Sequence, residues 1–192
     1  MRIIQISDTH MRHHDLKDIP EGDVLVHCGD FSHQGTEEEV LDFLNWFIDQ
    51  PHPWKLFVTG NHDACLWDAD GIEGLPENVI FMQNEFVVID GVSFFGLGFN
   101  EPEALIPDGV DVVITHEPPL HILDQSGEVN WGHLGIKQRI AEVNPRYHLF
   151  GHAHEAYGVM KIDDVVYSNA SLLDNMGEIT NSPRIIEVNK SK

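Results

Sequence analysis

Carboxylate, amide and imidazole side chains recur at five places in this sequence, each directly after a run of apolar residues. Aspartate, asparagine and histidine are suitable ligands for divalent metals, and histidine also transfers protons near neutral pH. The pattern therefore predicts metal-assisted acid–base chemistry. The fragments are Asp8-Thr9-His10, Gly29-Asp30, Gly60-Asn61-His62-Asp63, Thr115-His116 and Gly151-His152-Ala153-His154.

Neighbouring and alternating residues within these fragments indicate separate roles. Asn61 and His62 are adjacent, so an amide oxygen suited to a divalent metal stands beside an imidazole that can act on whatever the metal binds. In an extended segment, residues two apart point the same way, so we expect Asp8 and His10 to converge on one ion. The same alternation predicts that the two histidines of the last fragment point one way.

A single fragment of this kind also fits an ordinary polar turn after a strand. Five fragments that all follow strand patterns and all carry metal-binding groups are not explained by polar loops alone.

The elements that must position these fragments follow from apolar periodicity. Short, nearly continuous apolar runs are typical of strands buried on both faces. Between the second and third runs, Thr36 and Glu39 form a capping box that precedes a helical pattern. Strand, helix and strand in this order predict a parallel crossover unit, which binds ligands beyond the carboxyl ends of its strands. The expected strands are Arg2–Ser7, Asp23–Cys28, Trp54–Val58, Val110–Thr115 and Tyr147–Phe150, and the expected sheet-facing helix residues are Val40, Leu41, Leu44, Phe47 and Ile48.

The remaining segments predict shorter elements. Asp90-Gly91 between two apolar runs is a strong hairpin signal. Segment 117–131 begins with two prolines after Glu117 and is expected to be an irregular loop, in which Trp131 and His121 are candidates for substrate contact. A packed loop with a buried tryptophan is the alternative. Further strands are expected at Val79–Met82, Phe86–Ile89, Val92–Leu97, Tyr157–Ile162, Val165–Ser168 and Arg184–Val188, and a short helix at Leu134–Val143.

The composition is typical of one globular domain over residues 1–192, since 42% of the residues are hydrophobic and a chain of this length can bury a sizeable core. The formal net charge is −21, which would repel polyanions, so we expect no long nucleic acid as a partner. Solubility is an alternative reason for the many acids. Because a negative surface also repels phosphate, a phosphate-bearing substrate would be held by bound cations.

The two cysteines, Cys28 and Cys65, offer no disulfide framework, which favours a reducing compartment. Met1-Arg2 leads directly into a strand pattern, so we expect no signal peptide, and no apolar run is long enough to span a bilayer. We therefore expect a cytoplasmic protein that does not bind membranes, whereas its oligomeric state is not predicted.

Taken in order, the five fragments resemble the signature motifs of the calcineurin-like metallophosphoesterase superfamily. The resemblance runs from Arg2 to about Tyr157. Within the superfamily, Asp23–Phe31, Thr115–Pro119 and Phe150–Gly158 are most similar to the small metallophosphoesterase-domain proteins. The resemblance implies an α/β fold, a four-layer α/β/β/α sandwich with two mixed sheets, and a dinuclear metal centre at the strand ends.

The same resemblance implies a role for each site residue. Asp30 would bridge two divalent ions roughly 3.5–4 Å apart, and a hydroxide between them would attack phosphorus. His62 would face the leaving group as proton donor or charge stabiliser, and Asp63 would bond the other ring nitrogen of His62 and fix its tautomer. One ion would be held by Asp8, His10, Asp30 and His154, and the other by Asp30, Asn61, His116 and His152. Mn, Fe, Zn, Co and Ni suit these ligands about equally.

Departures from relatives narrow the expected substrate. Gln34 stands where protein serine/threonine phosphatases of this superfamily have an arginine, so their phosphate clamp is missing. His33 stands where purple acid phosphatases supply a tyrosine, so a purple iron site is not expected. Arg12 is the only arginine close in sequence to an expected ligand, and we expect Arg12, His33 and Trp131 to contact the substrate.

The sequence therefore predicts metal-dependent hydrolysis of small phosphate esters, with a phosphodiesterase acting on nucleotides or cyclic nucleotides as the leading hypothesis. A phosphomonoesterase of the same fold and a non-catalytic interaction scaffold are the alternatives. Scaffold relatives typically lose site residues, notably the histidine at the position of His62, which this chain keeps. A nuclease on long DNA is disfavoured by the net charge and by the absence of a basic stripe.

Overall fold

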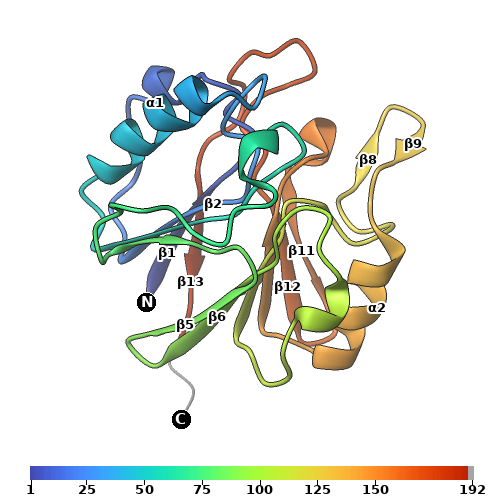
Figure 1. Cartoon of the computed structure of the whole chain (residues 1–192). Coiled ribbons are helices and arrows are strands. Elements are labelled where there is room, and N and C mark those ends of the chain that lie inside the picture. Colours follow the sequence, from blue (N-terminus) through green and yellow to red (C-terminus); the bar gives the residue numbers. More distant parts are fainter. Residues whose placement is uncertain (190–192) are drawn as a thin grey trace.

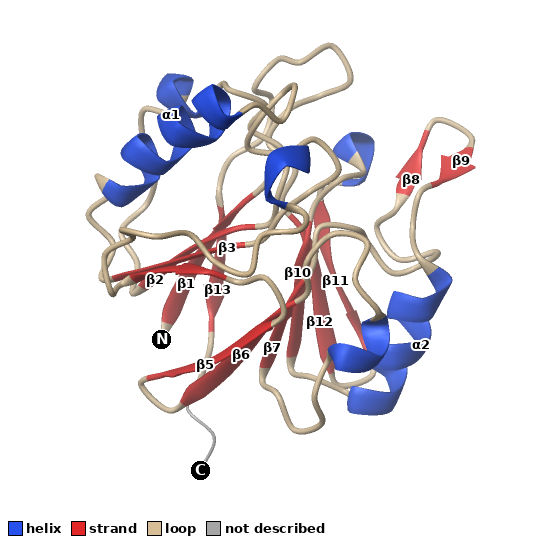
Figure 2. Cartoon of the chain, viewed as in Figure 1, coloured by secondary structure: helices blue, strands red, loops and turns tan. Residues whose placement is uncertain are grey.

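Two large β-sheets pack face to face in the computed structural model, which describes residues 1–189 (Figure 1). One α-helix lies against the outer face of each sheet (Figure 2). The layers therefore run helix α1, first sheet, second sheet, helix α2. This arrangement confirms the predicted four-layer sandwich with two mixed sheets.

The first sheet has the strand order β13-β1-β2-β3-β4. Neighbouring strands from β1 to β4 run parallel, whereas β13 pairs with β1 antiparallel and forms the edge. Parallel strands place all their carboxyl ends at the same edge of the sheet. The bounds are β1 Arg2–Ile6, β2 Val24–His27, β3 Trp54–Phe57, β4 Val79–Phe81 and β13 Arg184–Glu187.

The second sheet has the order β11-β12-β10-β7-β6-β5, with parallel pairs inside and one antiparallel pair at each edge. The predicted hairpin at Asp90-Gly91 is confirmed, and both residues have the positive φ angles, 48° and 83°, that a tight two-residue turn requires. The bounds are β5 Glu85–Ile89, β6 Val92–Gly96, β7 Val112–Ile114, β10 Tyr147–Phe150, β11 Gly158–Ile162 and β12 Val165–Asn169.

Strand alternation explains how three apolar layers form. Val24 and Val26 of β2 face the second sheet, whereas Leu25 between them faces α1. The helices are α1 (Glu37–Ile48) and α2 (Leu134–Val143). The inter-sheet core contains Val24, Val26, Leu56, Phe94, Ile114 and Leu149, the α1 layer Leu25, Phe43, Phe47 and Phe57, and the α2 layer Val113, Ile136, Ile140 and Phe150.

One helix prediction is wrong in detail. Leu41 was expected to face the sheet, but it is 60% exposed, and Phe43 lies buried in the α1 layer instead. The buried stripe of α1 is Val40, Phe43, Leu44 and Phe47, which follows the helical i, i+3, i+4, i+7 spacing more closely than a stripe that includes Leu41.

The segment 117–131, which was expected to be irregular, contains a small hairpin of β8 (Gln125–Ser126) and β9 (Val129–Asn130). Single 3₁₀ turns occur elsewhere in the connections. None of the helices in residues 1–189 is long and apolar enough to cross a membrane. The 3₁₀ turns are η1 His13–Asp15, η2 Ala64–Leu66, η3 Glu103–Leu105 and η4 His154–Ala156.

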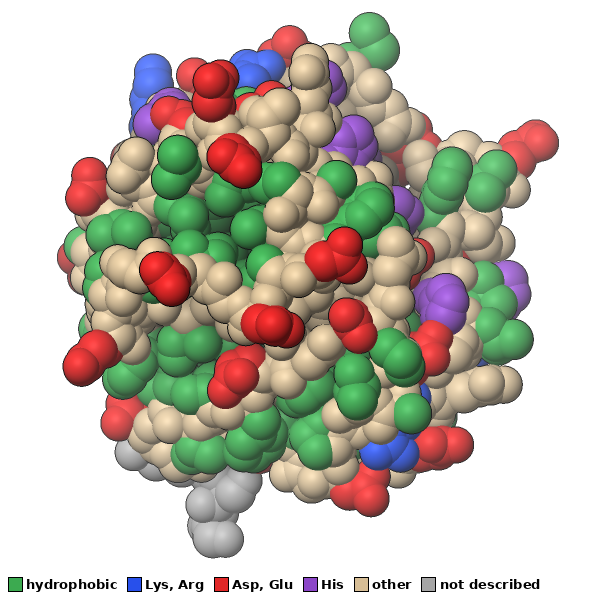
Figure 3. Space-filling view, viewed as in Figure 1, with side chains coloured by type: hydrophobic (Ala, Val, Ile, Leu, Met, Phe, Trp, Pro, Cys, Tyr) green, Lys and Arg blue, Asp and Glu red, His purple; other side chains and the backbone are tan. Residues whose placement is uncertain are grey.

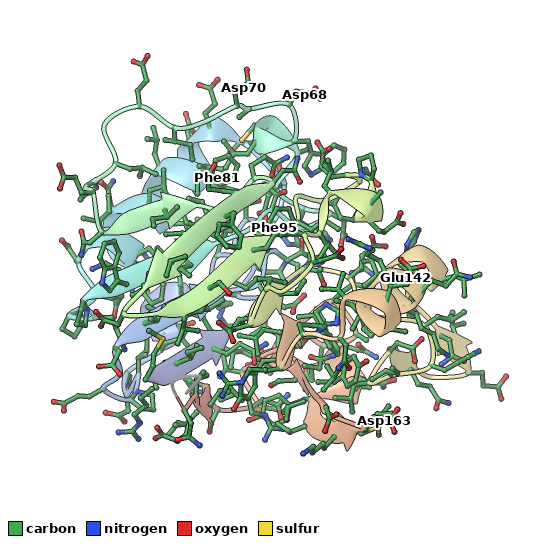
Figure 4. The ribbon with its side chains drawn as sticks, turned by 90° about the horizontal axis from the view of Figure 1, so that it is seen from below. Asp68, Asp70, Phe81, Phe95, Glu142 and Asp163 are labelled. Atoms are coloured by element: carbon green, nitrogen blue, oxygen red, sulfur yellow. The ribbon has the colours of Figure 1, made fainter. Side chains whose placement is uncertain are left out.

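The acidic side chains are spread over the surface. Figure 4 shows Asp68 and Asp70 on one loop, Glu142 on α2 and Asp163 in the β11–β12 turn, all at the periphery of the molecule, whereas Phe81 and Phe95 lie on the sheets. On the face seen in Figure 3, acids are scattered among other residues and lysine or arginine is sparse. This distribution gives a broadly negative surface without a basic stripe on that face.

Candidate metal centre

The parallel strands of both sheets deliver the predicted site residues to one edge. Strand β1 is followed by Asp8 and β2 by Asp30, while β7 and β10 of the second sheet are followed by His116 and His152. Asn61 follows β3. Side chains from both sheets meet there, because the imidazole Nε2 of His116 lies 2.9 Å from the Asn61 Oδ1 atom. The predicted convergence of strand ends is therefore present in the structure.

The extended backbone predicted for the first and last fragments is absent from the structure. Asp8, His10 and His152 were expected in extended segments, but their φ angles are 55°, 37° and 69°. A left-handed backbone costs roughly 1–2 kcal/mol in a residue with a Cβ, so other bonds must hold it. The N–H groups of Asp8 and His10 donate at 3.0 Å to the carbonyl oxygens of Gly29 and Asp30. Because His152 is also left-handed, the two histidines of the last fragment do not point the same way: His152 faces His116, whereas His154 faces Asp8.

Two glycines make room for the carboxylates. A Cβ at Gly60 would overlap the carboxylate of Asp30 and approach its backbone nitrogen to 2.5 Å. A Cβ at Gly151 would overlap the side chains of Ser7 and Asp8. The glycines of these fragments are therefore required by close approach of side chains to the backbone.

Ligand atoms at this edge form two clusters, and Asp30 of the second cluster also lies near His10 of the first. In the first ligand cluster, single ligand atoms of Asp8, His10 and His154 lie within 4.8 Å of one another. The second ligand cluster contains Asp30, His116 and His152 within the same limit. Asn61 contacts His116 of this cluster, as described above. Asp30 Oδ2 lies 3.7 Å from His10 Nε2 and 3.3 Å from His116 Nε2. A single carboxylate oxygen thus lies between the two clusters.

The ring orientation of four histidines is set by backbone carbonyl oxygens. A carbonyl only accepts hydrogen bonds, so each Nδ1 atom in these contacts carries the proton and leaves Nε2 free for the site. His152 is the exception, because its Nδ1 atom faces His116 at 3.1 Å. The pairs are His10 with Ser32 at 3.1 Å, His62 with His33 at 2.8 Å, His116 with Cys28 at 2.9 Å and His154 with Asp174 at 3.2 Å.

The charges of the site fit bound cations. Burial favours the neutral ring of His116, but the Asp30 carboxylate outweighs burial and raises the pKa of His116 to about 10. Burial would raise the pKa of Asp8, but the hydrogen bond from His154 and nearby histidines hold it below its usual value. Burial lowers the pKa of His152 to about 4, so its ring is neutral at pH 7. Without an ion, the protonated His116 ring balances the ionised carboxylates; a divalent cation would take the place of that proton and be held by carboxylates and imidazoles together.

Asp63 has a different role from the one predicted. It was expected to bond His62, but His62 Nδ1 donates to the carbonyl oxygen of His33. The fully buried Asp63 carboxylate instead accepts backbone N–H bonds from Asp30 at 2.8 Å, Gly60 at 2.8 Å and Ser32 at 3.0 Å. Burial, together with the nearby Asp30 charge, raises the pKa of Asp63 to about 6. Asp63 therefore ties together the segments that follow β2 and β3.

Glu39 is a site residue that the sequence analysis did not identify. Thr36 caps α1 as predicted, since its hydroxyl accepts from the Glu39 N–H at 3.3 Å. The Glu39 carboxylate, however, accepts N–H bonds from His33 at 3.0 Å, Gln34 at 2.7 Å and Gly35 at 3.1 Å. It holds the loop whose His33 carbonyl orients His62. The capping box was the only sequence signal for Glu39.

An open cleft of about 800 Å³ adjoins the first ligand cluster. Its walls include Arg12 and His33, and also His62, as expected for residues near the substrate. The Arg12 guanidinium already donates to Asp15 at 2.6 Å and to the carbonyl oxygen of Gly177 at 2.9 Å. The rest of the wall comes from His10, Met11, Glu39, His154 and segment 173–177.

The loop residues predicted to contact substrate lie in two different places. Trp131 is 53% exposed, and its ring centroid lies 5.9 Å from that of His152, so it borders the second ligand cluster. His121 lines a separate hollow together with Asp124 and Glu155. Trp131 thus stays a candidate for substrate contact, and the alternative of a buried tryptophan does not hold.

The comparisons with known proteins agree with this geometry. Residues 1–156 match the sequence profile of the family described as Calcineurin-like phosphoesterase. UPF0046 protein K07C11.7 of Caenorhabditis elegans is 34% identical, over 99% of this chain and 76% of that protein. Metallophosphoesterase domain-containing protein 1 of Homo sapiens is 32% identical, over 97% of this chain and 71% of that protein.

A solved structure has the same fold. The structure described as Phosphopantetheinyl Hydrolase (PptH) from Mycobacterium tuberculosis superimposes with a TM-score of 0.67 at 14% identity, over 96% of this chain and 95% of that one. At this identity the likeness concerns the fold alone. With the sequence match over most of its length, and with histidines and carboxylates gathered at its strand ends, the chain belongs to the calcineurin-like phosphoesterase family, whose chemistry is metal-dependent hydrolysis of phosphate esters.

Proposed function

We propose that this protein is a phosphodiesterase that hydrolyses small phosphate esters, with nucleotides and cyclic nucleotides as the leading substrates, and that it uses two divalent cations. The observation that carries the proposal is the position of Asp30 Oδ2 between His10 Nε2 and His116 Nε2. A carboxylate that lies close to the ligands of both clusters is suited to hold a pair of neighbouring cations.

Each cation would have its own ligands. Asp8, His10 and His154 would hold one ion, Asn61, His116 and His152 the other, and Asp30 both. Bound there, divalent cations would neutralise phosphate charge and lower the pKa of a water molecule. Mn, Fe, Zn, Co and Ni all suit these ligands.

His62 is the residue we assign to the leaving group. Its Nδ1 proton is engaged by the His33 carbonyl oxygen at 2.8 Å, so Nε2 is the nitrogen available to the cleft that His62 lines. A protonated Nε2 would donate to the departing ester oxygen and make it a better leaving group. Asp63 supports this chemistry only indirectly, by holding the Asp30 and Gly60 backbone.

Two features support a diester over a monoester. A monoester dianion is best held by a bidentate arginine. Gln34 replaces the arginine found in the protein phosphatases, and Arg12, the only arginine or lysine among the described residues that line the cleft, is already bonded to Asp15 and Gly177. Methionines Met11 and Met176 also line the cleft and offer apolar surface to an organic group such as a base.

The test compares two chromogenic esters. Chelated protein is assayed with added Mn²⁺ on bis(p-nitrophenyl) phosphate and p-nitrophenyl phosphate, and then on nucleoside 2′,3′- and 3′,5′-cyclic phosphates. We expect a clear preference for the diester. A strong monoester preference would favour the phosphomonoesterase alternative, and failure to hydrolyse any ester in a broad panel would favour the scaffold. The cytoplasmic location and the absence of nucleic-acid and membrane partners stay predictions.

A further inference from the structure

A second group of metal-binding side chains lies outside the catalytic centre. His13 and His14 of η1 both face Asp42 of α1. The Nε2 atoms of His13 and His14 lie 3.0 Å and 3.1 Å from the same oxygen, Asp42 Oδ2. The three ligand atoms all lie within 4.8 Å of one another.

These separations match the ligand shell of one transition-metal ion. With metal–ligand bonds of about 2.0–2.2 Å, neighbouring ligand atoms of a tetrahedral or octahedral ion lie roughly 3–3.5 Å apart. Two imidazoles and a carboxylate suit Zn²⁺, Co²⁺ or Ni²⁺. A carboxylate only accepts hydrogen bonds, so without an ion both Nε2 atoms carry protons. When an ion binds, each neutral ring would keep one proton, on Nδ1, and present Nε2 to the metal.

The cluster is organised before any ion arrives. The His13 side chain is fully buried, with its ring 5.8 Å from that of Phe43 and 5.1 Å from that of Trp46. Its Nδ1 atom has no hydrogen-bond partner among residues 1–189, so the contact with Asp42 alone directs the ring's polar edge. The His14 and Asp42 side chains are 58% and 45% exposed, which leaves the site open to ions from solvent and to water ligands.

We propose that His13, His14 and Asp42 bind one further divalent transition-metal ion of the zinc type. The ion would fasten η1 to α1. His13 directly follows Arg12, which lines the substrate cleft and bonds the Gly177 carbonyl oxygen. The site would therefore stabilise the wall of the cleft without contacting substrate, and the net charge of −21 would favour cation binding.

The test measures zinc per chain in the full-length protein. Wild type, His14→Gln and Asp42→Asn are equilibrated with micromolar Zn²⁺ and analysed for bound metal. We expect each variant to hold one zinc ion fewer than wild type, because removal of a ligand weakens affinity at least about tenfold. Zn²⁺ should also raise the melting temperature of wild type more than that of either variant.

The matched control is Asp49→Asn, which removes a carboxylate from the C-terminal cap of the same helix and should bind as much zinc as wild type. The difference between wild type and variant is independent of how many ions the catalytic centre holds, and esterase assays on the same samples report that centre separately. Equal zinc in wild type and both variants, or an extra ion that appears only at millimolar Zn²⁺, would overturn the proposal.

Discussion

The Asp63 carboxylate accepts a hydrogen bond from the backbone N–H of Asp30 at 2.8 Å. This contact joins the segments after two neighbouring strands, and the same carboxylate also accepts from Gly60 and Ser32. These backbone bonds give Asp63 a role that does not depend on the His62 ring. The His62 Nδ1–H group instead donates a hydrogen bond to the carbonyl oxygen of His33 at 2.8 Å.

Replacing Asp63 should therefore damage the architecture of the centre. Asp63→Ala would leave three buried N–H groups unpaired, at about 1–3 kcal/mol each, so we expect a large fall in the free energy of unfolding in urea and weaker Mn²⁺ binding. Asp63→Asn keeps one acceptor oxygen, so it should lower the free energy of unfolding and the Mn²⁺ affinity less than Asp63→Ala does. Lost turnover with unchanged stability and metal affinity would show instead that Asp63 acts through His62.

His62→Asn should separate catalysis from metal binding. The substitution removes the proton donor but none of the proposed ligands, so bound metal should stay the same while kcat falls by about 10²–10⁴-fold. Metal analysis and steady-state kinetics on bis(p-nitrophenyl) phosphate check both quantities. Loss of metal together with activity would mean that His62 is a ligand.

Glu39 should affect turnover through the loop at residues 33–35. Glu39→Ala removes three N–H contacts and frees the loop that carries the His33 carbonyl, so kcat should fall, on the order of tenfold, with metal content unchanged. The control is Glu38→Ala, one position earlier and exposed. If both variants behaved like wild type, the orientation of His62 would not depend on Glu39.

The buried His148 should make stability depend on pH. Burial lowers its pKa to about 3 from an ordinary 6.5, and its Nε2 atom contacts the Thr115 hydroxyl at 2.9 Å. Because the unfolded chain binds the proton more tightly, this contribution is complete above pH 6.5 and is lost as the pH falls toward 3.

Urea unfolding in the presence of a chelator checks this effect. Relative to His148→Gln, wild type should lose up to about 1.4 kcal/mol of unfolding free energy per pH unit between pH 6 and pH 4. A difference between the two proteins that stays constant over this range would contradict a neutral, buried His148.

The strand ends were predictable because each ligand directly follows an apolar run in the chain. Asp30 and His116 are examples, since a buried parallel strand must deliver the next residues to the sheet edge. The hairpin at Asp90-Gly91 was equally local. These features depend on short segments, which a sequence displays directly.

The features that were missed depend on contacts between distant segments. The left-handed backbone of Asp8 and His10 is held by carbonyl groups of residues 29 and 30, and the bond from the His116 ring to the Cys28 carbonyl spans 88 positions. The family resemblance implied a bond from Asp63 to its neighbour His62, and nothing in the sequence shows how closely the ends of β2 and β3 approach. Such pairings become visible only when the sheets are assembled.

The central claim is that two cations held on either side of Asp30 carry out diester hydrolysis. The most direct measurement titrates chelated Asp42→Asn protein, in which the separate site of His13, His14 and Asp42 lacks a ligand. Mn²⁺ is added at a protein concentration well above the dissociation constant, while turnover of bis(p-nitrophenyl) phosphate is followed. The account predicts no activity without metal, a rise with added Mn²⁺, and a plateau at two ions per chain. Full activity in the chelated protein, or a plateau at one ion, would contradict it.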